Sequence, residues 1–98
     1  MYFEWDADKN RINQRKHRGI DFALALRIFN DPNVLIEEDR VEEGGEVRLH
    51  ALGRINQLVL LVVHVHKETN YGEETIRIIS AREASKSEVR RYFAQAAH

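Results

Sequence analysis

The sequence of 98 residues contains no cysteine and a single proline. The absence of cysteine excludes a disulfide framework and thiolate catalysis, and it is compatible with a reducing compartment. The longest uninterrupted apolar run, residues 58–63, is far shorter than the roughly 20 residues needed to span a bilayer. The first ten residues lack the charged and then apolar order of a signal peptide. We therefore expect a soluble protein of the cytoplasm.

The sequence also lacks a strong net charge, because 15 Lys and Arg face 16 Asp and Glu for a total of -1. It is not a polycation that would bind nucleic acid over its whole surface. The charges are unevenly placed, however: residues 32–75 hold 4 basic and 9 acidic side chains, whereas residues 76–98 hold 5 and 2. Any binding site for a polyanion must therefore be local.

The hydrophobic pattern predicts one domain over residues 1–98. A short strand opens the chain, followed by a polar helix to about residue 17 and an apolar helix that ends before Asp31 and Pro32. Strands are expected near residues 33–38, 47–54, 58–66 and 75–80, with a loop over residues 67–74 and a final helix from Ser85. This order predicts an α+β fold with a mostly antiparallel sheet, two N-terminal helices and one C-terminal helix. Helices are expected on one face of the sheet only.

The last predicted strand, "IRIISAR", carries arginine in an otherwise apolar stretch. A buried guanidinium is costly unless it is paired, so Arg77 and Arg82 need an explanation. Alternation along the strand predicts that Arg77 lies on the opposite face from Ile76, Ile78 and Ser80. Arg82 is expected just beyond the strand. The two guanidinium groups are therefore candidates for binding a single phosphate.

Other cationic and imidazole side chains lie near the ends of predicted elements. Lys16 and His17 close the first helix, and Arg54 ends the strand in which Arg48 and His50 share its face. Such residues suit RNA cleavage by the RNA's own 2′-hydroxyl, which needs a base, cations for the phosphorane charge and an acid for the leaving oxygen. Arginine fits the second role because its planar fork meets phosphate oxygens bidentately.

Structural explanations stand beside each of these assignments. Arg77 could pair with an acidic residue of a neighbouring strand, and Lys16 and His17 also suit the negative end of a helix dipole. The two same-face histidines His64 and His66 are too few for a metal site. Gly44 and Gly45 lie in an acidic loop that would repel phosphate. No metal or cofactor is predicted.

Several segments in order resemble one known family. They are "FEWD", "NQRKHRGIDF", "A..IFND", "GR" and, most specifically, "IRIISAREASKSEVRRY". Together they cover nearly the whole chain and resemble the BrnT toxins of type II toxin-antitoxin systems. The family pattern Lys-His-Gly is interrupted here by Arg18, which lies at the predicted end of the first helix and affects the placement of His17.

The resemblance implies a RelE-like fold and a ribonuclease that inhibits translation and growth. It also implies a BrnA-like antitoxin with a ribbon-helix-helix part. The antitoxin would bind operator DNA, and the toxin would be linked to that DNA only through the antitoxin. The motif residues of the family fall on Lys16, His17, Arg54, Arg77 and Arg82, with Glu88 and Tyr92 completing the C-terminal motif.

Three hypotheses follow. In the first, the chain is a metal-independent endoribonuclease in which Arg77 and Arg82 bind the scissile phosphate and His17 or Lys16 transfers a proton or contacts phosphate. The residues expected to bind RNA are Arg54, Arg48 and His64, with His64 and His50 as reserve candidates for proton transfer because strand parity could place them on one face. In the second, the chain is a non-catalytic binding protein that acts on a protein target or as an antitoxin-bound co-repressor. In the third, the arginines only form salt bridges within the sheet.

Overall fold

The computed structural model describes residues 1–68 and 71–96 and has an α+β architecture. In chain order its elements are β1 (Tyr2–Glu4), α1 (Ala7–Lys16), α2 (Phe22–Ala25), the 3-10 helix η1 (Leu26–Asn30), β2 (Leu35–Val41), β3 (Val47–Ile55), β4 (Leu58–Glu68), β5 (Glu74–Glu83) and α3 (Lys86–Ala96). The predicted order of helices and strands is confirmed. The middle of the predicted loop, residues 69–70, lies outside the described residues.

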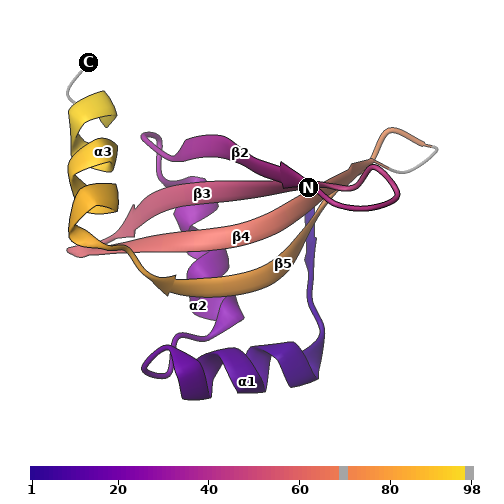
Figure 1. The fold of residues 1–98 in the computed structure, drawn as a ribbon, viewed down its shortest axis with the longest axis horizontal. Helices are drawn as coiled ribbons and strands as arrows, with labels where there is room; N and C mark the ends of the chain where they lie inside the picture. The colour runs from indigo at the N-terminus through magenta and orange to yellow at the C-terminus, as the bar shows by residue number, and fades with distance from the viewer. Residues whose placement is uncertain (69–70, 97–98) are drawn as a thin grey trace.

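The strands form one sheet in the order β1-β5-β4-β3-β2. Successive hairpins make β2, β3, β4 and β5 antiparallel, and only β1 joins in parallel, beside β5. The apolar strand β4 lies at the centre, as its sequence predicts, since a strand covered on both faces needs apolar residues on both. Figure 1 shows this sheet with α2 behind it and α3 at one end.

Two hydrophobic clusters lie on opposite faces of the sheet. We call the α2 face the one where Ala51, Leu60, Val62, Ile78 and Ala81 pack against α2 and η1. We call the α3 face the opposite one, where Leu52, Val59 and Leu61 pack against Tyr92 and Val89 of α3. The expectation of helices on one face only is wrong, because the apolar stripe of α3 covers one end of the second face.

Helix α1 lies along the edge of β5 beyond the point where β1 ends (Figure 1). Asn13 replaces a strand partner there: its side-chain oxygen accepts from the Ala81 N–H at 3.0 Å, and its amide donates to the Ala81 carbonyl at 2.7 Å. The amide also donates to the Ile20 carbonyl at 3.1 Å. Asn13 is only 4% exposed, and these bonds satisfy it fully. A polar helix thereby protects a sheet edge without an apolar stripe.

An irregularity in β5 changes which face its arginines occupy. Val63 pairs with Ser80, but the next residue, His64, pairs with Ile78, so one extra residue is accommodated at Ile79. Directly paired residues share a face, and Arg77 pairs with Val65 while Arg82 pairs with Leu61. Both arginines therefore lie on the α3 face.

Candidate functional site

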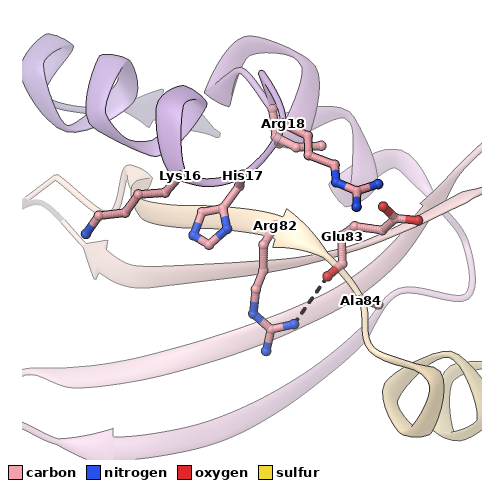
Figure 2. Close-up of a pocket in the computed structure, with 7 residues that line it drawn as sticks. Lys16, His17, Arg18, Arg82, Glu83 and Ala84 are labelled. Carbon is pink, nitrogen blue, oxygen red and sulfur yellow. Dashed lines mark hydrogen bonds between the residues drawn. The ribbon is translucent and has the colours of Figure 1, made fainter.

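A pocket lies where the end of α1 meets the end of β5. Its lining comprises Lys16, His17, Arg18, Ile20, Arg82, Glu83 and Ala84, and its volume is about 300 Å³. Figure 2 shows Lys16 and His17 reaching it from the last turn of α1, with the His17 ring beside the stem of Arg82. The structure thus brings together three of the four predicted catalytic residues.

The end of α1 is set by two residues in left-handed conformation. Arg18 has a φ of 53° and Gly19 a φ of 78°. The Gly19 N–H donates to the Gln14 carbonyl at 2.8 Å, which closes the helix, and His17 is its C-cap. The additional residue Arg18 is therefore absorbed in the turn that follows the helix, and His17 still lines the pocket.

Arg82 is held by Glu88 at the start of α3. Nη1 donates to Glu88 Oε1 at 2.7 Å and Nη2 donates to Glu88 Oε2 at 2.9 Å, while Nη1 also reaches the Glu83 carbonyl at 3.3 Å (Figure 2). These bonds occupy the end of the guanidinium fork, whereas Nε and the second N–H of Nη2, which form its side edge, make no hydrogen bond with the described residues. Arg82 lies within β5 rather than beyond it, and its side chain is 38% exposed.

Glu88 serves the helix and the arginine at once. The Ser85 N–H donates to Glu88 Oε1 at 2.8 Å and the Glu88 N–H to Ser85 Oγ at 3.3 Å, which confirms the predicted capping box. The hydrogen bonds from Arg82, aided by the Ser85 N–H and opposed by burial, lower the pKa of Glu88 to about 2. The same contact raises the pKa of Arg82. Arg82 and Glu88 therefore form a fixed ion pair beside the pocket.

Arg77 lies apart from this pocket. It lines a separate hollow with Glu4, Trp5 and Asp6, and its side chain makes no hydrogen bond or ion pair with the part of the chain that the structure describes. Its partner Val65 lies four residues from Leu61, the partner of Arg82, so the two arginines are about 13 Å apart along the strand. The prediction that both arginines meet one phosphate is wrong for this structure, because they line different pockets.

The other predicted RNA-binding arginines also occupy the α3 face. Arg54 is exposed at the end of β3, with its guanidinium carbon 5.8 Å from the centre of the Phe93 ring. Its backbone N–H donates to Asp31 Oδ2 at 2.8 Å. Arg48 is partly buried and pairs with Glu42 at 3.0 Å. Neither arginine lines the pocket of Lys16 and His17.

The predicted reserve histidines lie on opposite faces. His64 is 2% exposed on the α2 face, where its ring meets Phe29 edge to face at 5.0 Å between centres. Burial lowers the pKa of His64. His50 pairs with Val63 on the α3 face and lies 3.3 Å from Asp39. Their assignment to one face is wrong, and His64 is enclosed in the core, out of reach of RNA.

A comparison with protein families gives a match over most of the chain. Residues 5–88 match the family of ribonuclease toxins, BrnT, of type II toxin-antitoxin systems. The chain belongs to the BrnT toxin family. As a toxin of a type II system it pairs with an antitoxin and acts on RNA. No curated protein matches the chain.

The matched region of this BrnT chain contains Lys16, His17, Arg82 and Glu88, whereas Tyr92 lies beyond it. The structure gives Tyr92 a packing role. It is 1% exposed, and its hydroxyl donates to Asp31 Oδ2 at 2.5 Å. Burial and this contact raise the pKa of Tyr92 to about 12. Tyr92 therefore anchors α3 to the end of η1.

Sequence reasoning missed Asn13, which joins the two elements of the BrnT pocket. The His17 N–H donates to the Asn13 carbonyl at 2.9 Å, and the Asn13 side chain binds Ala81, the neighbour of Arg82. A lone asparagine inside a polar helix carries no periodic signal. The spacing of four residues before His17 was its one sequence cue.

Within the described ranges, 1–68 and 71–96, no group of three or more His, Cys, Asp or Glu side chains is placed to hold a metal ion. None of the helices described there is long and apolar enough to cross a membrane.

Proposed function

We propose that this BrnT chain is an endoribonuclease that cleaves RNA without a metal ion, with the pocket of Lys16, His17 and Arg82 as its catalytic centre. His17 takes the proton of the attacking 2′-hydroxyl and returns it to the departing 5′-oxygen, Lys16 neutralises the phosphate, and Arg82 stabilises the charge of the pentavalent phosphorane. The RelE-like fold that the family resemblance implies is compatible with the five-stranded sheet and its flanking helices.

The observation that carries this proposal is the meeting of these three residues across the α1–β5 contact (Figure 2). An imidazole can accept and return a proton, while the cations stabilise charge that develops in the transition state. Arg82 keeps its Nε and Nη2 edge available, and this edge meets two phosphate oxygens in the same way as the end of the fork. The pocket thus offers every chemical group that attack by the 2′-hydroxyl needs.

We assign the arginines of the α3 face to phosphates outside the pocket. Arg77 makes no ion pair in the described structure and lies on the same face as Arg82, so it is the strongest candidate for such a contact. Arg54 is exposed and suits a similar role, whereas Arg48 would have to leave Glu42. His64 is omitted from this set because it is buried.

We further propose that a BrnA-like antitoxin with a ribbon-helix-helix part neutralises the toxin and alone contacts operator DNA. Family membership supports this pairing. A neighbouring reading frame that encodes a short ribbon-helix-helix protein would identify the partner.

The decisive experiment incubates the purified chain with RNA in EDTA and analyses the ends of the products. The parent is expected to leave 2′,3′-cyclic phosphate ends. Arg82→Ala and His17→Ala should each lower the cleavage rate by about a hundredfold or more, as loss of a transition-state contact does. Arg90→Ala, which removes an exposed arginine of α3 outside the pocket, should cleave like the parent. The absence of cleavage at enzyme excess would refute the proposal.

Arg77 is tested in the same assay and in cells. Arg77→Ala should weaken RNA binding more than it slows the chemical step, because it lies outside the pocket. Combined with Arg82→Ala it should relieve growth inhibition while the thermal melt stays cooperative. A double variant as toxic as the parent would show that neither arginine contributes to toxicity.

One observation favours the non-catalytic alternative. Arg82 already has its end edge bound by Glu88, so it is less available than a free guanidinium would be. A protein that uses this ion pair only to fix α3 would bind its target without cleaving RNA. The EDTA assay separates the two candidates, because only the first produces new RNA ends.

A further inference from the structure

A second pocket adjoins the catalytic pocket and has no role in the function above. Its volume is about 200 Å³, and it is lined by Lys9, Ile12, Asn13, Lys16, His17, Ile79 and Ser80. Lys16 and His17 line both pockets. The two hollows therefore adjoin at Lys16 and His17 between α1 and β5, and we call them together the α1–β5 groove.

One face of α1 forms a wall of this groove. Lys9, Ile12, Asn13 and Lys16 recur at three- and four-residue spacing, so they share a helix face, and Lys9 lies about 10 Å from Lys16 along the axis. Neither ammonium forms an ion pair within the described residues. Ile12 is 49% exposed in the groove rather than packed in the core. The polar character of α1 therefore reflects a surface, not a weak helix.

The edge of β5 forms the other wall. Strand β1 pairs only as far as Arg77, so Ile79 and Ser80 have no strand on their outer side. The bulge at Ile79 lies at this point, and Asn13 binds β5 only at Ala81. The Ser80 hydroxyl and an apolar surface from Ile12 and Ile79 thus face the same space.

The charge of the groove is opposite to that of the chain. Its lining includes Lys9, Lys16, Arg18 and Arg82, whereas Glu83 is the one acidic residue that lines either pocket. The whole chain has a net charge of -1. A local concentration of cations with an apolar strip between them matches an extended polyanion that carries flat apolar groups.

We propose that the α1–β5 groove holds the single-stranded RNA adjoining the cleaved bond and that Lys9 binds the phosphate next to the scissile one. This inference rests on the proposed function, because it takes the pocket of His17 and Arg82 as the point of cleavage. Ribose and base lie against Ile12 and Ile79, and the hydroxyl of Ser80 donates to the backbone.

The test compares a dinucleoside monophosphate with the same compound carrying a second phosphate at its 5′ or 3′ end. One extended substrate should show a KM several-fold lower with the parent, and Lys9→Ala should abolish that advantage. Arg15→Ala is the matched control, since it removes one charge from the same helix outside both pockets. The advantage should persist in Arg15→Ala. The proposal would be refuted if both variants lost the KM advantage of the extended substrate equally. It would also be refuted if Lys9→Ala retained that advantage.

A second measurement separates this inference from the proposed catalysis. Binding of a 2′-O-methyl oligonucleotide, which cannot be cleaved, is followed by fluorescence anisotropy at several salt concentrations. Lys9→Ala should weaken binding several-fold and reduce the slope of log K against log salt by about 0.7, the value for one single-strand phosphate contact. If Lys9→Ala lowers the slope but the parent does not cleave ordinary RNA, RNA binding in the α1–β5 groove is supported and the proposed ribonuclease activity is refuted. An unchanged slope would refute the groove.

Discussion

Arg82 has two edges that can each bind an oxyanion, and in this structure Glu88 occupies the end edge. Glu88 accepts from Nη1 and Nη2 at the end of the fork, and this contact fixes the direction of the side edge, where Nε and the second N–H of Nη2 point. Under the proposed function, Glu88 is a positioning residue, because it fixes the arginine so that less rotational freedom is lost when phosphate binds.

Replacing Glu88 by Gln tests this positioning role. Gln still completes a capping box with Ser85, so α3 should form, but the charged contact with Arg82 is lost. We expect kcat to fall about tenfold, equivalent to about 1.4 kcal/mol, with a smaller change in KM. Steady-state cleavage over a series of RNA concentrations measures kcat and KM.

Glu37→Gln is the control, because it removes a comparable bond between Glu37 and Arg91 of α3 away from the pocket. It should leave kcat unchanged. A faster Glu88→Gln enzyme would contradict positioning and would mean that Glu88 competes with the phosphate.

Asn13 is the residue whose loss should harm both fold and site. Asn13→Ala leaves the N–H and carbonyl of Ala81 without partners at a buried edge. The free energy of unfolding should fall by about 3 kcal/mol, measured by urea denaturation. Gln14→Ala, a neighbour with one long side-chain bond of 3.4 Å, should change it by less than about 0.5 kcal/mol. Equal effects of the two would show that the edge contact is unimportant.

At the scale of elements, β3 and η1 approach so closely that one position must be glycine. A Cβ at Gly53 would lie 2.6 Å from the Ile28 Cβ and 3.1 Å from its carbonyl oxygen. The "GR" segment therefore has a packing explanation for its first residue, and only Arg54 needs a functional one. Gly53→Ala should lower the free energy of unfolding by about 1 to 3 kcal/mol through overpacking. A melting temperature equal to that of the parent would contradict this.

The elements themselves could be predicted because each carries its own period or cap. Examples are the capping box of Ser85 and Glu88 and the alternation of β3. The faces could not be predicted, since the bulge at Ile79 reverses parity between Arg77 and Arg82. A single extra residue in a strand leaves no compositional trace.

Three of the four predicted catalytic residues come together in the structure, and the fourth does not, because the sequence shows the ends of elements but not distances between them. Lys16, His17 and Arg82 come together because they lie at adjoining ends of α1 and β5. Arg77 does not join them, because it lies farther back along β5 and its side chain lines the hollow of Glu4, Trp5 and Asp6. Asn13 could not be predicted, because its partner Ala81 is 68 residues away.

For the whole molecule, buried and paired groups predict a loss of stability in acid in two stages. Burial lowers the pKa of His64 below 6.5, so the unfolded state binds this proton first and stability falls as the pH drops below that value. His66 and His50, which also act on His64, add to the effect. Glu88, whose pKa falls from 4.5 to about 2, gives a second loss between these values.

Thermal melts at a series of pH values measure both stages. His64→Leu should remove the first stage, so that its melting temperature stays nearly constant from about pH 7 to about pH 5. The second stage should remain, because Asp31 also has a lowered pKa: burial opposes the shift, but hydrogen bonds from Tyr92 and two backbone N–H groups outweigh it. An unaltered first stage in His64→Leu would assign it to another group.

Under the proposed function, the α1–β5 contact also determines when the toxin becomes active during its synthesis. The hairpins from β2 to β5 join neighbouring segments, whereas Asn13 must wait for Ala81. The N-terminal half of the catalytic pocket leaves the ribosome long before its arginine does. On that proposal, a nascent chain cannot attack RNA near the ribosome that is making it until β5 has emerged.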